Sequence, residues 1–126
     1  MAPLLIAIVD DDDSFRLAMS RIVRAHDLEV RTYASGEAFL DTLPEVVPAC
    51  VLLDLNLPGI GGLDVLRRLE DAGRAIPAIV MTGVVQTGLR ETCLAAGAVA
   101  FLTKPIGAAN FAKALGEALE KGEFRT

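Results

Sequence analysis

Positive charge, cysteine and histidine are scarce in this chain of 126 residues. Its net charge at pH 7 is −5, which argues against a surface that binds nucleic acid regardless of base sequence. Its 2 cysteines lie far apart in apolar patterns and form no CxxC pair, so we expect buried thiols in a reducing compartment. The 1 histidine, His26, has no metal-ligand partner four residues further on, so we interpret it as structural.

Long hydrophobic runs and a basic N-terminal segment are also missing. No apolar stretch is long enough to span a bilayer, and residues 1–5 lack the positive charge of a signal peptide. We therefore expect a cytoplasmic protein without membrane contact. There is no internal linker, repeat or low-complexity segment, so we expect residues 1–126 to form one domain with its own core. Residues 120–126 are either a plain tail or the beginning of a linker.

The chain does contain short apolar runs, each of which stops at a small polar residue or at a lysine. The runs span 6–9, 50–53, 78–81 and 98–103, and they meet Asp10, Asp54, Thr82 and Lys104. Such runs are typical of strands buried on both faces of a parallel sheet. Parallel strands end at one edge, where open α/β folds bind their ligands. Carboxylates, a hydroxyl and an ammonium at that edge predict a metal-assisted phosphoryl site.

Between the apolar runs, the hydrophobic spacing changes to steps of three and four, which predicts helices. One face of the first helix is marked by Phe15, Met19, Ile22, Val23 and His26, with Asp12 or Asp13 as its N-cap. Residues 28–33 alternate as an edge strand does, and Ser35 caps a short helix after them. The helix near 87–96 has the thinnest apolar stripe. Five βα units in succession predict an α/β fold with helices on both faces of the sheet.

Short motifs at the predicted strand ends and turns cover nearly the whole chain. They are Ile8–Asp12, Leu53–Gly59, Gly61–Leu66, Met81–Gly83, Ala96–Ala98 and Phe101–Pro105. In this order they resemble the receiver domain of two-component response regulators, most nearly the nitrogen-fixation type, whose full-length members add a DNA-binding helix-turn-helix. The resemblance implies a flavodoxin-like (βα)5 fold, doubly wound, with a five-stranded parallel sheet in the order 2-1-3-4-5. We expect no output domain within residues 1–126.

The chemistry of the predicted edge and the resemblance agree on Asp54 as the nucleophile, which would become an aspartyl phosphate. Crowded carboxylates raise one another's pKa unless a hard cation keeps them ionised, and Mg²⁺ suits that role. By resemblance, Asp11 binds the metal directly and Asp10 acts largely through water. Asp54 and the backbone carbonyl of Asn56 complete the predicted metal site.

The resemblance also assigns three roles beside the metal. Lys104 is expected to pair with Asp54 at rest and with a phosphoryl oxygen after transfer, aimed inward by a cis peptide before Pro105. Thr82 is expected to hydrogen-bond another phosphoryl oxygen, in the modified state only. Phe101 is either a plain core residue or an aromatic switch that changes rotamer on activation.

The function implied is a phosphorylation-controlled switch and not a metabolic enzyme. A sensor histidine kinase or a histidine phosphotransferase would supply the phosphoryl group. The surface of the fourth helix, fifth strand and fifth helix would respond, with a homodimer as one outcome, and the domain itself would not bind nucleic acid. Ile106 and Gly107 depart from the family pattern beside that surface, so we expect the last helix to begin loosely.

Other interpretations of the same residues are weaker. Asp10-x-Asp12 superficially matches the signature of haloacid-dehalogenase phosphohydrolases, which also use an aspartyl phosphate. Those enzymes follow the signature with Gly-Thr and need a longer chain with a cap, whereas Asp13-Ser14 follows here.

A flavodoxin-like cofactor binder would share the fold, but the acidic loop after the first strand repels a phosphate. An aspartate run can be a mere N-cap, and Asp54 a turn former, but their coincidence with other strand ends favours function.

Overall fold

The computed structural model describes residues 3–123, with side chains described as far as residue 120. Strands and helices alternate along the chain: β1 (Leu5–Val9), α1 (Asp13–Arg24), β2 (Glu29–Tyr33), α2 (Gly36–Asp41), β3 (Cys50–Asp54), α3 (Gly62–Asp71), β4 (Ala78–Thr82), α4 (Leu89–Ala95), β5 (Ala100–Thr103) and α5 (Ala108–Glu123). All neighbouring strands are parallel. Their order β2-β1-β3-β4-β5 confirms the predicted topology. The tail or linker expected at 120–126 lies outside the described residues from 124 onward.

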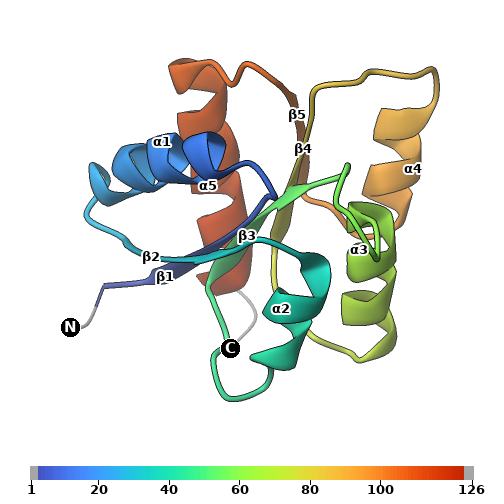
Figure 1. Cartoon of the computed structure of the whole chain (residues 1–126). Coiled ribbons are helices and arrows are strands. Elements are labelled where there is room, and N and C mark those ends of the chain that lie inside the picture. The colour runs from blue at the N-terminus through green and yellow to red at the C-terminus, as the bar shows by residue number, and fades with distance from the viewer. Residues whose placement is uncertain (1–2, 124–126) are drawn as a thin grey trace.

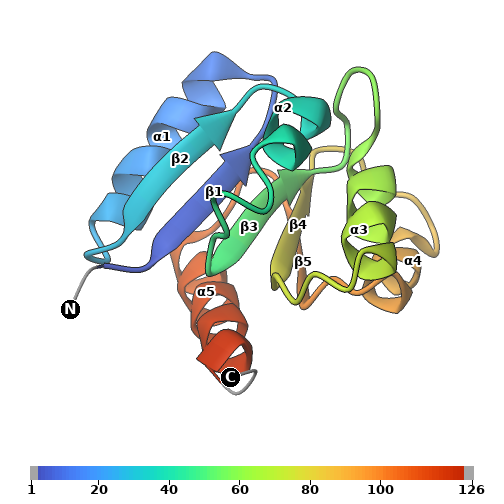
Figure 2. The same cartoon turned by 90° about the horizontal axis from the view of Figure 1, so that it is seen from below.

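Two hydrophobic layers hold the helices on the sheet, because successive side chains of a strand point to opposite faces. Ile6 and Ile8 of β1 belong to the layer beneath α1 and α5, whereas Ala7 and Val9 belong to the layer beneath α2, α3 and α4. Figure 1 shows the same division of the helices between the two faces. Figure 2 shows β2, β1 and β3 side by side with their arrowheads pointing the same way.

The strands differ in burial according to their place in the sheet. Every residue of β3 and β4 is buried, as predicted for strands covered on both faces. At one edge, β2 contains only exposed and half-buried residues, which confirms its prediction as a wetter edge strand. At the other edge, β5 is shorter than the predicted run and only partly buried, so the prediction of full burial for 98–103 is wrong there. An edge strand has a neighbour on one side only, and α4 beside it is short.

The helix N-termini follow the predicted capping. The Asp12 carboxylate accepts a hydrogen bond from the Phe15 amide, 3.1 Å away, so Asp12 caps α1 and Asp13 is its first residue. Ser35 caps α2 in the same way. The predicted buried face of α1 is wrong at its end, because the helix stops at Arg24 and His26 is exposed beyond it.

Ile22, also predicted on that buried face, is 40% exposed, and Ser20 is buried in its stead. The last helix begins directly after Gly107, whose carbonyl accepts the Phe111 amide at 2.9 Å. The first turn of α5 therefore forms on backbone hydrogen bonds, without the side-chain cap that Gly107 lacks.

Cys50 and Cys93 are free and fully buried, as expected. Burial raises the pKa of the Cys50 thiol to about 12 and also raises that of Cys93, so both behave as small hydrophobic residues. Cys93 is the buried residue of α4, in agreement with the thin apolar stripe of that helix in the sequence. Within the described residues, no helix combines the length and the apolar character needed to cross a membrane.

Candidate functional site

The sheet register brings the predicted polar residues to one edge. Asp10 follows β1, Asp54 and Thr82 are the last residues of β3 and β4, and Lys104 follows β5. The strand ladder continues into the loops, where the Lys104 amide donates to the Thr82 carbonyl at 2.8 Å. The carboxylates, the hydroxyl and the ammonium therefore meet at the carboxyl ends of neighbouring strands, as predicted.

Three aspartates form an acidic cluster at this edge. Among the described residues, Asp10, Asp11 and Asp54 each offer one carboxylate oxygen, and these oxygens all lie within 4.8 Å of one another. Asp10 is 0% and Asp54 is 4% exposed. Asp11 is exposed, so the cluster opens to solvent on its side. An all-oxygen set of this kind suits a hard divalent cation.

Asp54 is held in a polar but desolvated position. Burial raises the pKa of its carboxyl above the usual value, and the negative charges of Asp10 and Asp11 add to the increase. The Asn56 backbone N–H, which donates to Asp54 Oδ1 at 3.1 Å, and the Lys104 ammonium oppose the increase without cancelling it. Protonation of Asp54 is therefore easier than for a free aspartate unless a cation offsets the charge.

The backbone of Asp54 is packed closely against the first residue of α3. A Cβ at Gly62, the first residue of α3, would lie 2.4 Å from the Asp54 carbonyl oxygen. Only glycine lets the N-terminus of α3 approach the end of β3 so closely. Gly62 of the sequence motif therefore has a packing role at the site.

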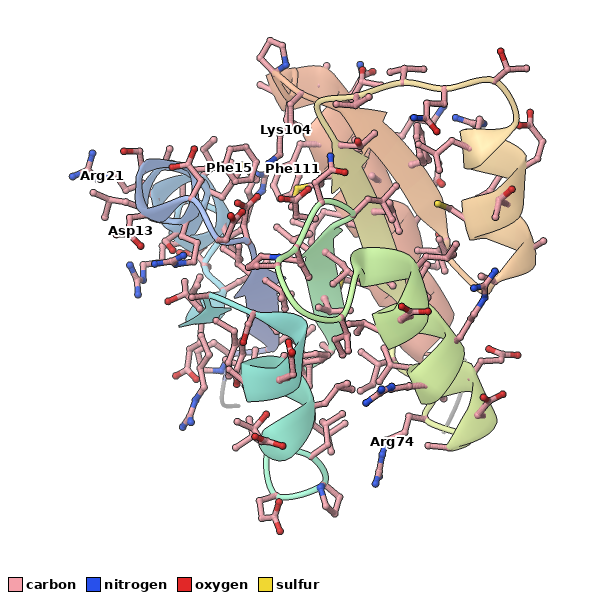
Figure 3. All side chains as sticks on the ribbon, turned by 45° about the vertical axis from the view of Figure 1, so that its right-hand side comes forward. Asp13, Phe15, Arg21, Arg74, Lys104 and Phe111 are labelled. Atoms are coloured by element: carbon pink, nitrogen blue, oxygen red, sulfur yellow. The ribbon has the colours of Figure 1, made fainter. Side chains whose placement is uncertain are left out.

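Lys104 contacts two of the three aspartates. Its Nζ lies 2.7 Å from Asp10 Oδ2 and 3.6 Å from Asp54 Oδ2, so the pairing expected with Asp54 is the longer of its two ion pairs. The Lys104–Pro105 peptide is cis, as the resemblance implied. Nζ also lies 4.1 Å from the centroid of the Phe15 ring. In Figure 3, Phe15 and Lys104 lie close together at one end of the molecule.

The Thr82 hydroxyl is fully engaged in local hydrogen bonds. Its Oγ1 donates to the Val84 carbonyl at 3.0 Å and accepts from the Val84 amide at 3.1 Å. The side-chain amide of Asn56 donates to the same oxygen at 3.3 Å. A hydroxyl has one donor and two acceptor sites, so Thr82 must release Val84 before it can donate elsewhere. From the sequence, only the backbone carbonyl of Asn56 was expected at the site, and this side-chain contact was not predicted.

Arg16 is a further residue at the site, and its contacts were not predicted from the sequence. Its Nη1 donates to the Asp10 backbone carbonyl at 2.6 Å, and its Nη2 pairs with the carboxylate of Asp13. Arg16 therefore ties the first turn of α1 to the end of β1. The signal available in the sequence was the three-residue spacing from Asp13 to Arg16, which places both on one helical face.

Phe101 lies away from the acidic cluster, on the strand at the sheet edge. It pairs in register with Val80, is partly buried, and packs against the hydrophobic layer beneath α2, α3 and α4. It also lines a groove between α4 and α5, together with Arg90, Leu94, Lys113 and Glu117. This position is compatible with both expected roles of Phe101, core residue and switch.

Comparison with known proteins agrees with this architecture. Residues 6–116 match the response regulator receiver domain family. The response regulator protein TmoT of Ectopseudomonas mendocina is 38% identical over 101 residues, which cover 80% of this chain and 46% of TmoT. The transcriptional regulatory protein FixJ of Azorhizobium caulinodans is 33% identical over 123 residues, which cover 94% of this chain and 58% of FixJ.

The fold comparison gives the same result. The crystal structure of FixJ-N has a TM-score of 0.86 and 32% identity to this chain, covering 95% of this chain and 96% of FixJ-N. An open α/β sheet with an acidic cluster at its carboxyl edge is the fold and site of a two-component receiver. The chain belongs to the response regulator receiver domain family, and the likeness to FixJ confirms the expected nitrogen-fixation type. It spans about half the length of the curated relatives that it matches.

Proposed function

We propose that this chain is a phosphorylation-controlled switch in which Asp54 accepts a phosphoryl group. The observation that supports Asp54 over Asp10 as the phosphoryl acceptor is the number of hydrogen bonds that their carboxylate oxygens accept. Asp10 Oδ1 accepts the Asp12 amide at 2.9 Å, and Asp10 Oδ2 accepts Lys104 at 2.7 Å. Asp54 Oδ2 has no hydrogen bond within the described part of the chain, and its contact with Lys104 is 3.6 Å long. Asp54 therefore keeps an oxygen available for attack.

The donor is the phosphohistidine of a sensor histidine kinase or of a histidine phosphotransferase. An Asp54 carboxylate oxygen attacks phosphorus, the P–N bond breaks, and its electron pair remains on the imidazole nitrogen of the donor. Phosphoryl transfer needs positioning and charge neutralisation more than covalent assistance. The Lys104 ammonium supplies positive charge beside the transferred group. The protein is thus an acceptor that promotes only its own phosphorylation and dephosphorylation.

Magnesium is the cofactor that the acidic cluster fits. The carboxylates of Asp10, Asp11 and Asp54, with the backbone carbonyl of Asn56, would hold the ion through oxygen alone, as Mg²⁺ prefers. Bound there, Mg²⁺ supplies charge neutralisation at the phosphoryl oxygens. The exposed position of Asp11 gives the ion a path from solvent.

Phosphorylation is read out on the surface of α4, β5 and α5. The new negative charge and oxygens beside Thr82 favour redirection of its hydroxyl from Val84 toward the phosphoryl group. Movement of Thr82 leaves space under β4, which Phe101 on the neighbouring strand fills. The groove lined by Arg90, Lys113 and Glu117 is thereby reshaped for a partner or for a second copy of the chain.

The regulated output is transcription, as it is for the transcriptional regulatory protein FixJ, to which this chain is similar. The receiver itself does not contact nucleic acid, in keeping with its net charge of −5. The output therefore depends on another segment or on another protein that reads the α4–β5–α5 surface.

Intact mass spectrometry with acetyl phosphate and Mg²⁺ tests the proposal. We expect the wild type to gain the mass of one phosphoryl group, and borohydride reduction followed by peptide mapping to place it on Asp54. Asp54→Asn and Asp54→Ala should gain none. The matched control is Asp64→Asn, which removes an exposed carboxylate of α3 outside the acidic cluster and should leave the gain intact. Stoichiometric phosphate on Asp54→Asn would show that the acceptor is a different residue.

A further inference from the structure

The Lys104 ammonium is held between a carboxylate and an aromatic ring. Nζ lies 2.7 Å from Asp10 Oδ2 and 4.1 Å from the centroid of the Phe15 ring. The Lys104 side chain is 22% exposed and that of Asp10 is 0% exposed, so solvent screens these contacts only in part. The ring therefore stabilises the ammonium at the position where Asp10 is the nearer carboxylate.

The helix turn that carries the Phe15 ring is tied to the loop after β1 by two hydrogen bonds. The Phe15 amide donates to the N-cap Asp12 at 3.1 Å. The next residue, Arg16, donates to the Asp10 carbonyl at 2.6 Å. The turn that carries the ring is thus tied on both sides to the loop that carries Asp10. Figure 3 shows Phe15 on α1 near Lys104, which comes from the loop after β5.

The ammonium and a divalent cation need the same carboxylate. Asp10 Oδ1 accepts a hydrogen bond from the Asp12 amide and Asp10 Oδ2 accepts one from Lys104, so both oxygens are engaged. Two positive ions at one carboxylate repel each other. Whatever stabilises the ammonium on Asp10 therefore disfavours the binding of a cation at the acidic cluster.

We propose that Phe15 is a positioning residue for Lys104, whose ring retains the ammonium on Asp10 and thereby weakens Mg²⁺ binding in the unmodified protein. This inference rests on the proposed function for its assignment of the metal to the acidic cluster. Loss of the ring face should release the lysine and tighten Mg²⁺ binding. A cation–π contact at a partly exposed position corresponds to about a two- to five-fold change in an equilibrium constant.

Calorimetric titration with Mg²⁺ provides the first test. Phe15→Leu keeps an apolar side chain without the ring, and we expect its Kd for Mg²⁺ to be about two- to five-fold lower than that of the wild type. Phe15→Tyr keeps the ring and should bind Mg²⁺ as the wild type does. Pentafluorophenylalanine at position 15 keeps the shape but withdraws electron density from the ring face, so it should behave like Phe15→Leu.

The same substitution in a Lys104→Met background separates a cation–π effect from packing. We expect Phe15→Leu to leave the Kd for Mg²⁺ unchanged there, because no ammonium remains to be held. Equal Kd values for wild type and Phe15→Leu would overturn the inference, and so would an equal shift in both backgrounds, since that shift would come from packing alone.

A double-mutant cycle on metal-free unfolding keeps the test independent of metal binding and of phosphorylation. In the presence of a chelator, Phe15 and Lys104 should show a favourable coupling of about two- to five-fold in the unfolding equilibrium constant. Absence of coupling would overturn the role of Phe15 whatever the acceptor residue is. Coupling without any phosphate on Asp54 would instead support the role of Phe15 and contradict the proposed function.

Discussion

Two regions of the molecule differ in how firmly they are built: strands β1 and β3, called here the well-packed half, and β5 with α4, called here the thinly packed half. Strand β1, which Asp10 follows, and strand β3, which ends at Asp54, are almost entirely buried and lie between other strands on both sides. Strand β5 is only partly buried, and Cys93 is the buried residue of α4 beside it. The loop between β4 and α4 exposes Val84 and Val85. The buried carboxylates of Asp10 and Asp54 thus lie at the ends of the well-packed half, and the thinly packed half is free to respond.

This difference has a thermodynamic meaning. Regions with few buried apolar contacts open at lower free energy than core strands do, so they are the regions that a ligand or a modification can shift. A phosphoryl group on Asp54 would act at the boundary between the halves, where Thr82 ends β4. The comparison predicts unequal effects of similar changes in the two halves.

The largest expected effect comes from the same truncation placed in each half. Leu53→Ala in β3 removes a side chain that is 0% exposed and should lower the free energy of unfolding by about 2–5 kcal/mol. Leu94→Ala in α4 removes one that is 38% exposed and should cost about 0.5 kcal/mol or less. Urea denaturation of both variants measures the difference, and equal costs would refute the proposed asymmetry.

The next effect concerns metal binding at the well-packed half. Mg²⁺ at one hundred times its Kd should stabilise the wild type by about 2.7 kcal/mol if the unfolded chain does not bind it. Asp11→Asn removes one charge from the acidic cluster, so it should melt higher than the wild type in a chelator and lose most of the response to Mg²⁺. Thermal unfolding with and without Mg²⁺ measures both. Equal shifts for the two proteins would exclude Asp11 as a main ligand.

A smaller effect should follow the charge state of Asp54 in the metal-free protein. Its pKa is raised in the folded state, so the folded protein binds a proton more tightly than the unfolded chain does. Below the usual pKa of an aspartate the side chain is neutral in both states and costs nothing. As the pH rises through the folded-state pKa, wild-type stability should fall relative to that of Asp54→Asn, which carries no such charge.

Urea denaturation in a chelator, from about pH 3 to pH 7, should therefore show an advantage of Asp54→Asn that grows with pH through this window. Glu45→Gln, an exposed change in the loop between α2 and β3, corrects for the general effect of removing one negative charge. An advantage that stays constant with pH after this correction would contradict a raised pKa for Asp54.

Much of this fold could be predicted from the sequence because its central strands are apolar runs with polar ends. The runs before Asp54 and Thr82 became β3 and β4, and the shared direction of parallel strands was enough to bring their ends together. The partial exposure of β5 could not be predicted in the same way. Its residues are as apolar as those of β4, and only the strand order shows that it has a neighbour on one side alone.

The site was predictable by residue type but not by pairing. The meeting of Asp10 and Asp54 followed from the strand ends, and the family resemblance added Asp11 to the predicted cluster. Lys104 lies nearer to Asp10 than to Asp54, and the two distances differ by less than 1 Å. This difference depends on how the side chains are arranged, which the spacing of residues along the sequence does not reveal. The contact between the Asn56 side chain and Thr82 likewise joins positions far apart in the chain.

Hydrogen exchange with and without beryllofluoride and Mg²⁺ tests most directly whether the well-packed half controls the thinly packed one. Beryllofluoride stands in for the phosphoryl group on Asp54, and it can shift the protein only through better contacts with the active state than with the resting state. We predict changed protection in segments 83–96 and 100–118, and a weaker change in Thr82→Ala, which lacks the hydroxyl. Changes confined to residues 10–12 and 54–60 would contradict the account, because the domain would then hold the group without relaying it.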